Sequence, residues 1–391
     1  MTEDTMSGLP KGFFDTTGAL AYKYYLAIED FYKTGNEFGF QLSYPSEVGF
    51  QSTYLNFGTA ALGRCYTFQD RGNNAIMLSS DSLATCIRQY LGSSDCGRIN
   101  RVMAKTPVFR YKHKKYRRFN HLVYTIFQER DEITTTLALF KAAHCYLSHY
   151  YDNIEYDIYL YGIFEEATWI LNRTHEQIYD VLYARNRNDE SHADSVIDAF
   201  VSEVERIGLD SRSWQEAFQN LSAVFPKLSS ILDRYAIFFT ALDGKHIKYT
   251  VMWRNYHAIE YSSGICFIMK DEKNTLADGG SYSYIVNKLN PSILTCYSFA
   301  CSVESLPLKD TLVDDSPIII YVIKLDCSYP FFLRTVDGLR GIGYNIHEIV
   351  SDEPLRKTLR VLPKRSKVVV VGMEEEKKQI VIVNGHPFNV L

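Results

Sequence analysis

Apolar residues recur along the chain with two different spacings, and the changes between them predict an alternation of helices and strands. Over residues 18–38 the spacing is helical and predicts an amphipathic helix, followed by a short strand pattern that ends at Pro45. Residues 65–81 alternate around a polar Gly-Asn turn. This pattern predicts a hairpin that leads into a helix capped by one of residues 79–81.

Residues 107–127 form a polar tip between two runs of β-branched and aromatic residues. The pattern predicts two antiparallel strands joined by a very short turn. Six of the nine residues from Arg110 to Arg118 are Lys or Arg, so the tip carries a concentrated positive field suited to phosphate. The alternative is a solvated turn, because runs of like charge are usually exposed faces.

Helical spacing dominates the middle of the chain. Residues 129–150 and 154–171 each predict a helix, further helical segments extend to Leu242, and residues 247–253 then alternate like a strand. A shift in composition at residues 313–317 predicts a domain boundary. Beyond this boundary, strand and helix patterns alternate, which predicts a small α/β domain with a largely parallel sheet.

Length and charge narrow the class of protein. The 391 residues, 46% of them apolar, are enough for two or three domains with real cores. A net charge of −4 argues against generic coating of nucleic acid, so any such contact is expected at the tip of residues 110–118. The sequence shows no signal segment or transmembrane run, and we expect a soluble, cytoplasmic protein without a membrane partner.

The spacing of cysteine and histidine predicts no metal site. The eight cysteines include no Cys-x-x-Cys pair and no His partner at zinc spacing. This favours reduced, mostly buried thiols over a disulfide or metal framework. The ten histidines form no His-Glu-x-x-His set, and the chain has no P-loop and no Gly-x-Ser-x-Gly nucleophile motif.

The hairpin pattern of residues 107–127 resembles motif 2 of class II aminoacyl-tRNA synthetases. Arg110 follows an aromatic residue on the first strand, and Phe119 lies on the return strand four residues after Lys115. In that motif the Arg holds the α-phosphate of ATP, a second cation reaches the γ-phosphate, and the aromatic ring stacks on adenine. The resemblance therefore implies that Arg110, Lys115 and Phe119 bind a nucleotide, with ATP and Mg²⁺ as cofactors.

Further segments are similar to those of histidyl-tRNA synthetases, in the same order and at similar spacing. Residues 65–81 resemble the segment that contains Tyr-x-Phe-x-Asp, and residues 257–267 resemble the histidine-recognition element. A helix followed by a strand that ends in proline, as in residues 18–45, is the form of motif 1, which builds the dimer interface. Residues 314–391 are similar to the anticodon-binding domain in order and place.

The resemblance implies an α+β fold with a class II synthetase antiparallel-sheet core and a helical insertion, followed by a small α/β anticodon-binding-like domain. The implied parts are the first part of the core with motifs 1 and 2 (residues 1–128), the helical insertion region (129–242), the second part of the core with remnants of the histidine element and motif 3 (243–313), and the anticodon-binding-like domain (314–391).

The departures from the family fall on residues that do chemistry. His257 replaces the arginine of the recognition element, while Glu260 keeps its acidic position. Asp81 is the carboxylate left in a segment that loses its arginine, and His121 replaces a glutamine that reads histidine. These four residues form the implied ligand pocket. Ser305 stands where motif 3 has its terminal arginine.

Synthetases activate an amino acid mainly by positioning and by stabilising negative charge, so each lost cation is expected to cost rate steeply. We therefore favour a catalytically degenerate histidyl-tRNA synthetase paralogue that acts as a homodimeric regulatory or binding protein. Its expected partner is tRNA, another nucleic acid or a protein. The family precedents are the regulatory subunit of ATP phosphoribosyltransferase and the synthetase-like module of the translation-control kinase. The candidate nucleic-acid contacts are Lys112, Lys114, Arg117 and Arg118.

The alternative is a residual ATP-dependent adenylating enzyme or ligase for an amino acid other than histidine. Asp81 and Glu260 can still bind an amino group through charge-assisted hydrogen bonds. The motif 3 cation separates the two hypotheses. Ser305 favours the binding protein, whereas an arginine brought in by folding, such as Arg254, favours the enzyme.

Overall fold

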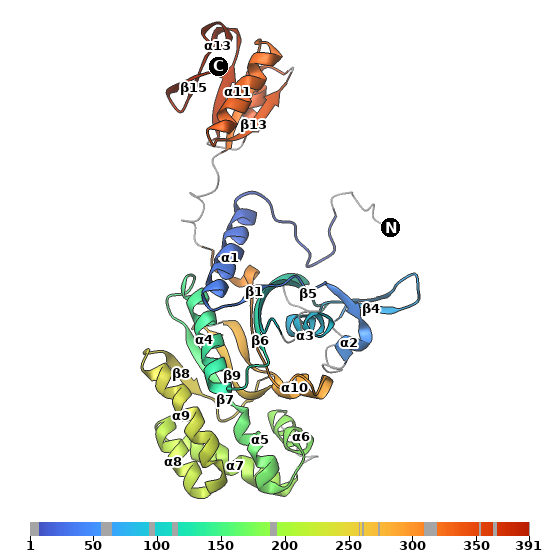
Figure 1. Ribbon diagram of the computed structural model, residues 1–391, viewed down its shortest axis with the longest axis vertical. Coiled ribbons are helices and arrows are strands. Elements are labelled where there is room, and N and C mark those ends of the chain that lie inside the picture. Colours follow the sequence, from blue (N-terminus) through green and yellow to red (C-terminus); the bar gives the residue numbers. More distant parts are fainter. Residues whose placement is uncertain are drawn as a thin grey trace. The chain divides into compact units, whose positions relative to one another are not determined.

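The chain divides into two compact units, Met1–Leu308 and Lys309–Leu391. The computed structural model describes residues 8–55, 65–93, 98–111, 116–187, 194–257, 259, 262–272, 274–308, 319–351, 353–362 and 366–390 (Figure 1). The predicted boundary at residues 313–317 lies outside these described residues. None of the described helices is long and apolar enough to span a bilayer.

The first unit is built on an eight-stranded sheet with the strand order β1-β5-β6-β11-β10-β9-β7-β8. Its central strands are antiparallel, and only the outer pairs β1–β5 and β7–β8 are parallel. The strands are β1 (Gln41–Leu42), β5 (Arg101–Phe109), β6 (Arg118–Phe127), β7 (Glu155–Leu160), β8 (Lys248–Val251), β9 (Ser263–Lys270), β10 (Thr275–Ser281) and β11 (Cys296–Ser302). The predicted α+β class with an antiparallel core is confirmed.

Strands β5 and β6 form the hairpin that the basic tip predicts. Val108 pairs with Phe119 and Phe109 pairs with Arg118 at the end of the ladder. Successive residues of β6 point to opposite faces of the sheet, as in any strand. Tyr124 packs beneath α1 (Gly18–Glu37), with its ring 4.2 Å from that of Phe31, whereas Val123 packs with Cys86 on the other face.

Helices cover the Tyr124 face of the sheet. Figure 1 shows α1 and α4 (Glu132–Ser148) on the same side of the strands, and the two helices pack together. The core between helices and sheet is rich in aromatic rings, and the Tyr124 hydroxyl donates to the Phe31 carbonyl at 2.7 Å. The predicted amphipathic helix of residues 18–38 is α1, and its buried face anchors this core.

The opposite face carries α3 and a small sheet of order β2-β4-β3. The predicted hairpin of residues 65–81 is β3–β4, and its turn places Asn73 at φ 59°. Asp81 is the cap of α3, because its side chain accepts a hydrogen bond from the Ala84 N–H at 3.1 Å. These elements are β2 (Val48–Phe50), α2 (Gln51–Leu55), β3 (Thr67–Gln69), β4 (Ala75–Leu78) and α3 (Ser82–Gly92).

The helix predicted over residues 154–171 is wrong in its first part. Strand β7 occupies Glu155–Leu160, and only α5 (Tyr161–Leu171) is helical. Five of the six β7 residues are buried, and the strand leads directly into α5 as a mostly apolar run, Tyr156–Phe164, in which only Asp157 is charged. Such a run does not distinguish a buried strand from a buried helix.

The rest of the region that was predicted to be helical is helical. It contains α6 (His175–Asn186), α7 (Ser195–Asp210), α8 (Trp214–Val224) and α9 (Ser229–Asp243). The strand predicted at residues 247–253 is confirmed as β8, which returns the chain to the sheet.

The second unit has its own core and a parallel sheet of order β13-β12-β14. The predicted alternation of strands and helices is confirmed, but β15 pairs only with β16, in an antiparallel hairpin. The elements are β12 (Ile319–Lys324), α11 (Tyr329–Gly341), β13 (Asn345–Val350), α12 (Leu355–Val361), β14 (Lys367–Val371), α13 (Met373–Lys378), β15 (Ile380–Val383) and β16 (His386–Asn389).

Candidate functional site

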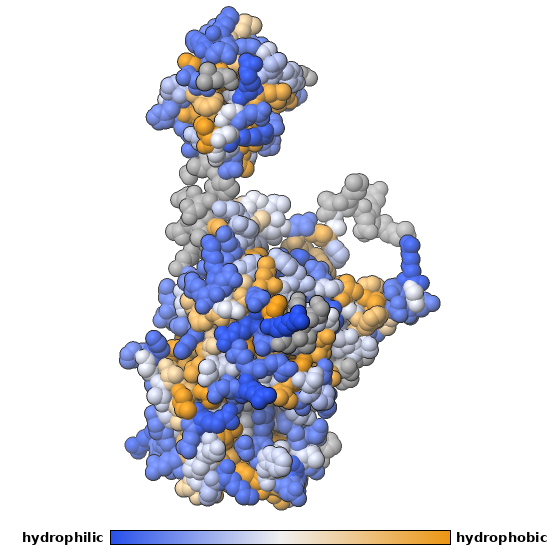
Figure 2. Space-filling model, in the orientation of Figure 1, coloured by the Kyte–Doolittle hydropathy of each residue, from blue (hydrophilic) through white to orange (hydrophobic). Residues whose placement is uncertain are grey.

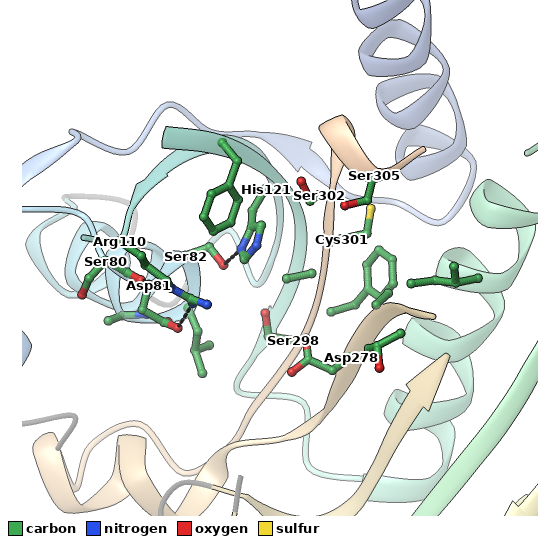
Figure 3. A pocket seen from close by; sticks show the side chains of 18 of the residues that line it. Ser80, Asp81, Ser82, Arg110, His121, Asp278, Ser298, Cys301, Ser302 and Ser305 are labelled. Atoms are coloured by element: carbon green, nitrogen blue, oxygen red, sulfur yellow. Dashed lines mark hydrogen bonds and ion pairs between the residues drawn. The ribbon is translucent and has the colours of Figure 1, made fainter. Parts of the chain in front are cut away.

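A cavity of about 410 Å³ opens on the α3 face of the main sheet. Five predicted site residues line it although they are far apart in sequence, namely Asp81, Arg110, Phe119, His121 and His257. Figure 3 shows Arg110 and Asp81 on one side of the cavity, with Ser302 and Ser305 on the other side.

Four other predicted site residues, Lys112, Lys114, Lys115 and Glu260, lie outside the described residues.

Arg110 lies directly after β5, where its guanidinium turns into the cavity (Figure 3). Nε donates to the Ser80 carbonyl at 2.9 Å, and Nη2 lies 3.6 Å from Oδ2 of Asp81. The guanidinium carbon is 5.7 Å from the centre of the Phe119 ring. This side chain therefore already has an acceptor, an anion and an aromatic neighbour within the protein.

Phe119 offers little surface to a ligand. It lies on β6 and only 4% of the residue is exposed. Its ring centre is 5.1 Å from that of His121, two residues along the same face of the strand. The predicted aromatic platform is therefore present in the cavity wall but is largely covered by protein.

The two cavity histidines are both held by polar neighbours. Nδ1 of His121 shares a hydrogen bond of 2.9 Å with the hydroxyl of Ser82, in the first turn of α3. Nε2 of His257 lies 3.4 Å from Oδ2 of Asp278 on β10. Asp278 thus stands across the cavity from Asp81, as Figure 3 shows.

Strand β11 and the short helix η3 (Val303–Ser305) form the wall where motif 3 is expected. Buried hydroxyls of Ser298 and Thr125 lie 3.1 Å apart, and the Ser302 hydroxyl donates to Glu304. Glu304 also accepts hydrogen bonds from the backbone N–H and the side-chain amide of Asn120, at 2.9 and 2.7 Å. This carboxylate is therefore committed to holding β6 against η3.

Arg254, the arginine that the alternative hypothesis could bring in by folding, does not replace the lost motif 3 cation. Its Nε donates at 2.8 Å to Glu205 of α7, a residue that is only 3% exposed, and Arg254 does not line the cavity. Among the described residues that line the cavity, Arg110 is the only Lys or Arg. A triphosphate needs several cations, so the described part of this cavity fits ATP poorly.

The described residues also contain no metal-binding cluster. Within the ranges given above, they hold no group of three or more His, Cys, Asp or Glu that could bind a metal ion. The seven described cysteines are free, and Cys96 lies outside the described residues.

Two of the candidate nucleic-acid contacts are described, and neither lines the cavity. The Arg117 guanidinium lies over the ring of Tyr111, 4.6 Å from its centre. Arg118 is exposed at the start of β6 and has no ion pair with any described residue. Of the three arginines at the basic tip, Arg110 therefore lines the cavity, whereas Arg117 and Arg118 lie outside it.

Sequence reasoning missed the partners that hold the predicted residues. Asp278 precedes Gly279 and Gly280 on β10, and nothing in this pattern indicates a contact with His257. Ser82 directly follows Asp81, and only the packing of α3 on β6 brings it to His121.

Comparison with known proteins places these features in a family context. No protein-family model matches the sequence. A curated relative, a histidine–tRNA ligase from Syntrophotalea carbinolica, is 24% identical over 255 residues. The aligned part covers 62% of this chain and 59% of that relative, so the match spans less than two thirds of the relative's length.

Solved structures match over nearly the whole chain. One is an ATP phosphoribosyltransferase regulatory subunit/histidyl-tRNA synthetase from Bacillus halodurans, with a TM-score of 0.71, 12% identity, and 94% of this chain and 99% of that chain covered. Another is the apo histidyl-tRNA synthetase of S. aureus, with a TM-score of 0.71, 14% identity, and 98% and 97% covered. A third is histidyl-tRNA synthetase from Nostoc sp. PCC 7120, with a TM-score of 0.69, 12% identity, and 98% and 96% covered. The chain therefore resembles histidyl-tRNA synthetases in sequence and has their class II fold.

Proposed function

We propose that this protein is a catalytically degenerate relative of histidyl-tRNA synthetases that binds RNA as a homodimer and does not activate an amino acid. One observation carries the proposal. The guanidinium of Arg110, the only one among the described cavity residues, is bonded to the Ser80 carbonyl and paired with Asp81. Asp81 therefore competes with a phosphate for the N–H donors of this guanidinium that Ser80 leaves available.

The charges around the cavity support the loss of adenylation. Asp81 and Asp278 place two carboxylates in it, and the only described groups that offset them are Arg110 and two histidines. Transfer to the α-phosphate of ATP develops negative charge, which such a site repels rather than stabilises. Ser305, at the place of the motif 3 arginine, supplies a hydroxyl and no charge.

The two hairpin arginines outside the cavity, Arg117 and Arg118, support a role in RNA binding. Arg118 is exposed without a described ion-pair partner, and Arg117 stacks on Tyr111. A guanidinium held on an aromatic ring can still donate to a phosphate through its edge. Since the similar proteins include histidyl-tRNA synthetases, tRNA is the RNA class we expect.

The distribution of exposed apolar residues supports a homodimer. Eight of the large apolar residues that are exposed lie between residues 14 and 68, a range that includes residues 18–45, which resemble motif 1. They are Phe14, Leu20, Tyr25, Leu42, Tyr44, Val48, Phe50 and Phe68. Exposed apolar residues that form a contiguous patch mark protein interaction surfaces. The similar Bacillus halodurans protein is described as a regulatory subunit, and a regulatory role is the one we favour here.

Two binding measurements test the proposal. Titration calorimetry with ATP and Mg²⁺ is expected to show no heat of binding to folded wild-type protein. A gel shift with tRNA is expected to show binding that Arg117→Ala/Arg118→Ala weakens at least several-fold, because two phosphate contacts are removed. Arg212→Ala, an exposed arginine before α8, is the matched control and should leave the shift unchanged.

The opposite results are equally informative. ATP binding that Arg110→Ala abolishes would favour the alternative, an adenylating enzyme for an amino acid other than histidine, in which Asp81 holds the amino group. An unchanged gel shift in the double arginine variant would remove the hairpin from RNA binding.

A further inference from the structure

The segment before α1 is attached to the tip of the β5–β6 hairpin. The carbonyl of Gly12 accepts hydrogen bonds from the backbone N–H groups of Arg117, at 2.8 Å, and of Arg118, at 3.5 Å. The Arg117 carbonyl in turn accepts from the Arg110 N–H at 2.9 Å. The backbone of Arg117 is therefore bonded on both sides, to the neighbouring strand end and to residues 10–14, which we call the strap.

The strap also contacts the side chain of Arg117. Gly12 has φ +85°, and a Cβ at this position would lie 2.6 Å from Cγ of Arg117 and 3.1 Å from its Cβ. The aliphatic part of Arg117 thus lies directly on the glycine, and its guanidinium lies over Tyr111. Only glycine allows both the backbone conformation and this contact.

Aromatic rings tie the same neighbourhood together. Tyr111 is edge-on to Tyr66, with ring centres 5.7 Å apart, and Tyr66 is edge-on to Phe13 of the strap, at 6.0 Å. Phe14 is edge-on to Tyr116, which lines the cavity, at 5.5 Å. The strap is thus fastened at Phe13 and Phe14, on either side of the arginine that Gly12 supports.

We propose that Gly12 is a positioning residue for Arg117, and that the strap holds this guanidinium in place for an RNA phosphate. The proposal rests on the proposed function, in which Arg117 contacts RNA. A free arginine side chain loses much rotamer freedom when it binds, and holding its stem in advance removes part of that cost. None of the strap residues belongs to the hydrophobic core clusters of the described chain, so the strap serves the hairpin tip rather than the core.

A double-mutant cycle tests the inference. The affinity for tRNA is measured over a salt series for wild type, Gly12→Ala, Arg117→Ala and the double variant. Arg117→Ala should weaken binding several-fold and reduce the salt slope by about one phosphate contact. Gly12→Ala should weaken binding in the same direction, and the double variant should bind no more weakly than Arg117→Ala alone.

Gly39→Ala is the matched control. Gly39 has φ +77°, and a Cβ there would meet nothing within 4 Å, so its substitution imposes a similar backbone strain without touching Arg117. It should leave the affinity for tRNA unchanged. If Gly12→Ala fails to fold, Phe13→Ala replaces it in the cycle, because it removes the contact with Tyr66 and keeps the glycine.

The outcomes distinguish the RNA-binding role of Arg117 from the positioning role of Gly12. If Arg117→Ala leaves the affinity unchanged, the RNA-binding role of this arginine fails. If Arg117→Ala weakens binding but Gly12→Ala does not, or if the two effects add, the positioning role of Gly12 is wrong. Hydrogen exchange at the Arg117 amide, without RNA, should be faster in Gly12→Ala than in wild type, and equal rates would also contradict the proposal.

Discussion

Two carboxylates, Glu132 and Glu165, meet at the start of β9, and we expect them to make the stability of the protein depend on pH. The N–H of Ile265 donates to Glu132 at 3.0 Å, and that of Gly264 donates to Glu165 at 3.3 Å. Burial, together with the charge of Glu132, raises the pKa of Glu165 to about 7. Gly264, at φ +51°, has no space for a Cβ, which would lie 2.1 Å from a Glu132 oxygen.

We predict that Glu165→Gln stabilises the protein at pH 8 and not at pH 5. The raised pKa means that the folded state binds the proton more tightly than the unfolded state, so stability falls as the pH rises from about 4.5 through about 7. Glutamine removes this loss, which is worth about 3 kcal/mol at pH 8. Urea unfolding at pH 5, 6.5 and 8 measures the difference.

The three pH values distinguish the contribution of Glu165 to stability from that of a buried histidine, His175. Burial lowers the pKa of His175 to about 4, so its contribution to stability is lost as the pH falls below 6.5. Above pH 6.5 the histidine no longer contributes to the slope. Glu166→Gln, on the same helix, is the control for charge removal. A stabilisation by Glu165→Gln that is the same at all three pH values would count against the assigned cause.

The sequence predicted which residues lie together in the cavity better than it predicted the partners that hold them. Asp81, Arg110 and Phe119 converge because the hairpin and the capped helix are local patterns with clear signals. Contacts made over long separations in sequence were not predictable, since they depend on strand register and helix placement. His121 is hydrogen-bonded to Ser82, which is 39 residues away in sequence, and Arg254 is hydrogen-bonded to Glu205, which is 49 residues away.

At the scale of elements, α3 depends on a single capping side chain that also restrains the cavity arginine. Asp81 accepts from the Ala84 N–H through Oδ1, and its other oxygen, Oδ2, lies 3.6 Å from Arg110. The cap satisfies an N–H group that has no partner within the helix. The ion pair is partly exposed and adds little stability by itself.

We predict that Asp81→Ala lowers the free energy of unfolding by about 1 kcal/mol and that Asp81→Asn lowers it much less. Asparagine keeps the capping oxygen and loses only the charge, so it is the matched variant. Denaturant unfolding of the two variants beside wild type measures the difference. Equal losses in both variants would assign the stability to the ion pair with Arg110 instead of the cap.

Elements were predictable where polar positions break the apolar pattern. The β5–β6 hairpin has a charged tip and α1 has an exposed face, so both stood out in the sequence. Strand β7 passes directly into α5 at Tyr161 without a turn residue between them, so the sequence does not mark where the strand ends. The pairing of β15 with β16 instead of the parallel sheet depends on tertiary contacts that single-segment patterns do not contain.

At the scale of the whole molecule, the first unit exposes large apolar side chains between residues 14 and 68 that no described part of the chain covers. Figure 2 shows apolar surface on the flank that carries β3 and β4. Tyr44 is 79% exposed, two residues after β1, and Phe50 is 55% exposed, at the end of β2. Burial of such residues in an interface contributes free energy in proportion to their apolar area.

We predict that Tyr44→Asp/Phe50→Asp converts a dimer into a monomer at micromolar concentration, because two buried charges oppose the interface. Sedimentation velocity of the variant beside wild type measures the mass. Trp169→Asp is the control, since Trp169 is 82% exposed on α5, outside this surface. A wild-type protein that sediments as a monomer would remove the homodimer from the proposed function.

The alternation along β6 also explains how such a protein can diverge. Leu122, Tyr124 and Ile126 serve the helix-covered core, while Phe119 and His121 face the cavity. Substitutions on one face therefore escape the selection that maintains the other. A lineage can replace its catalytic residues one at a time while the scaffold persists, which fits a shared architecture at 12–14% identity.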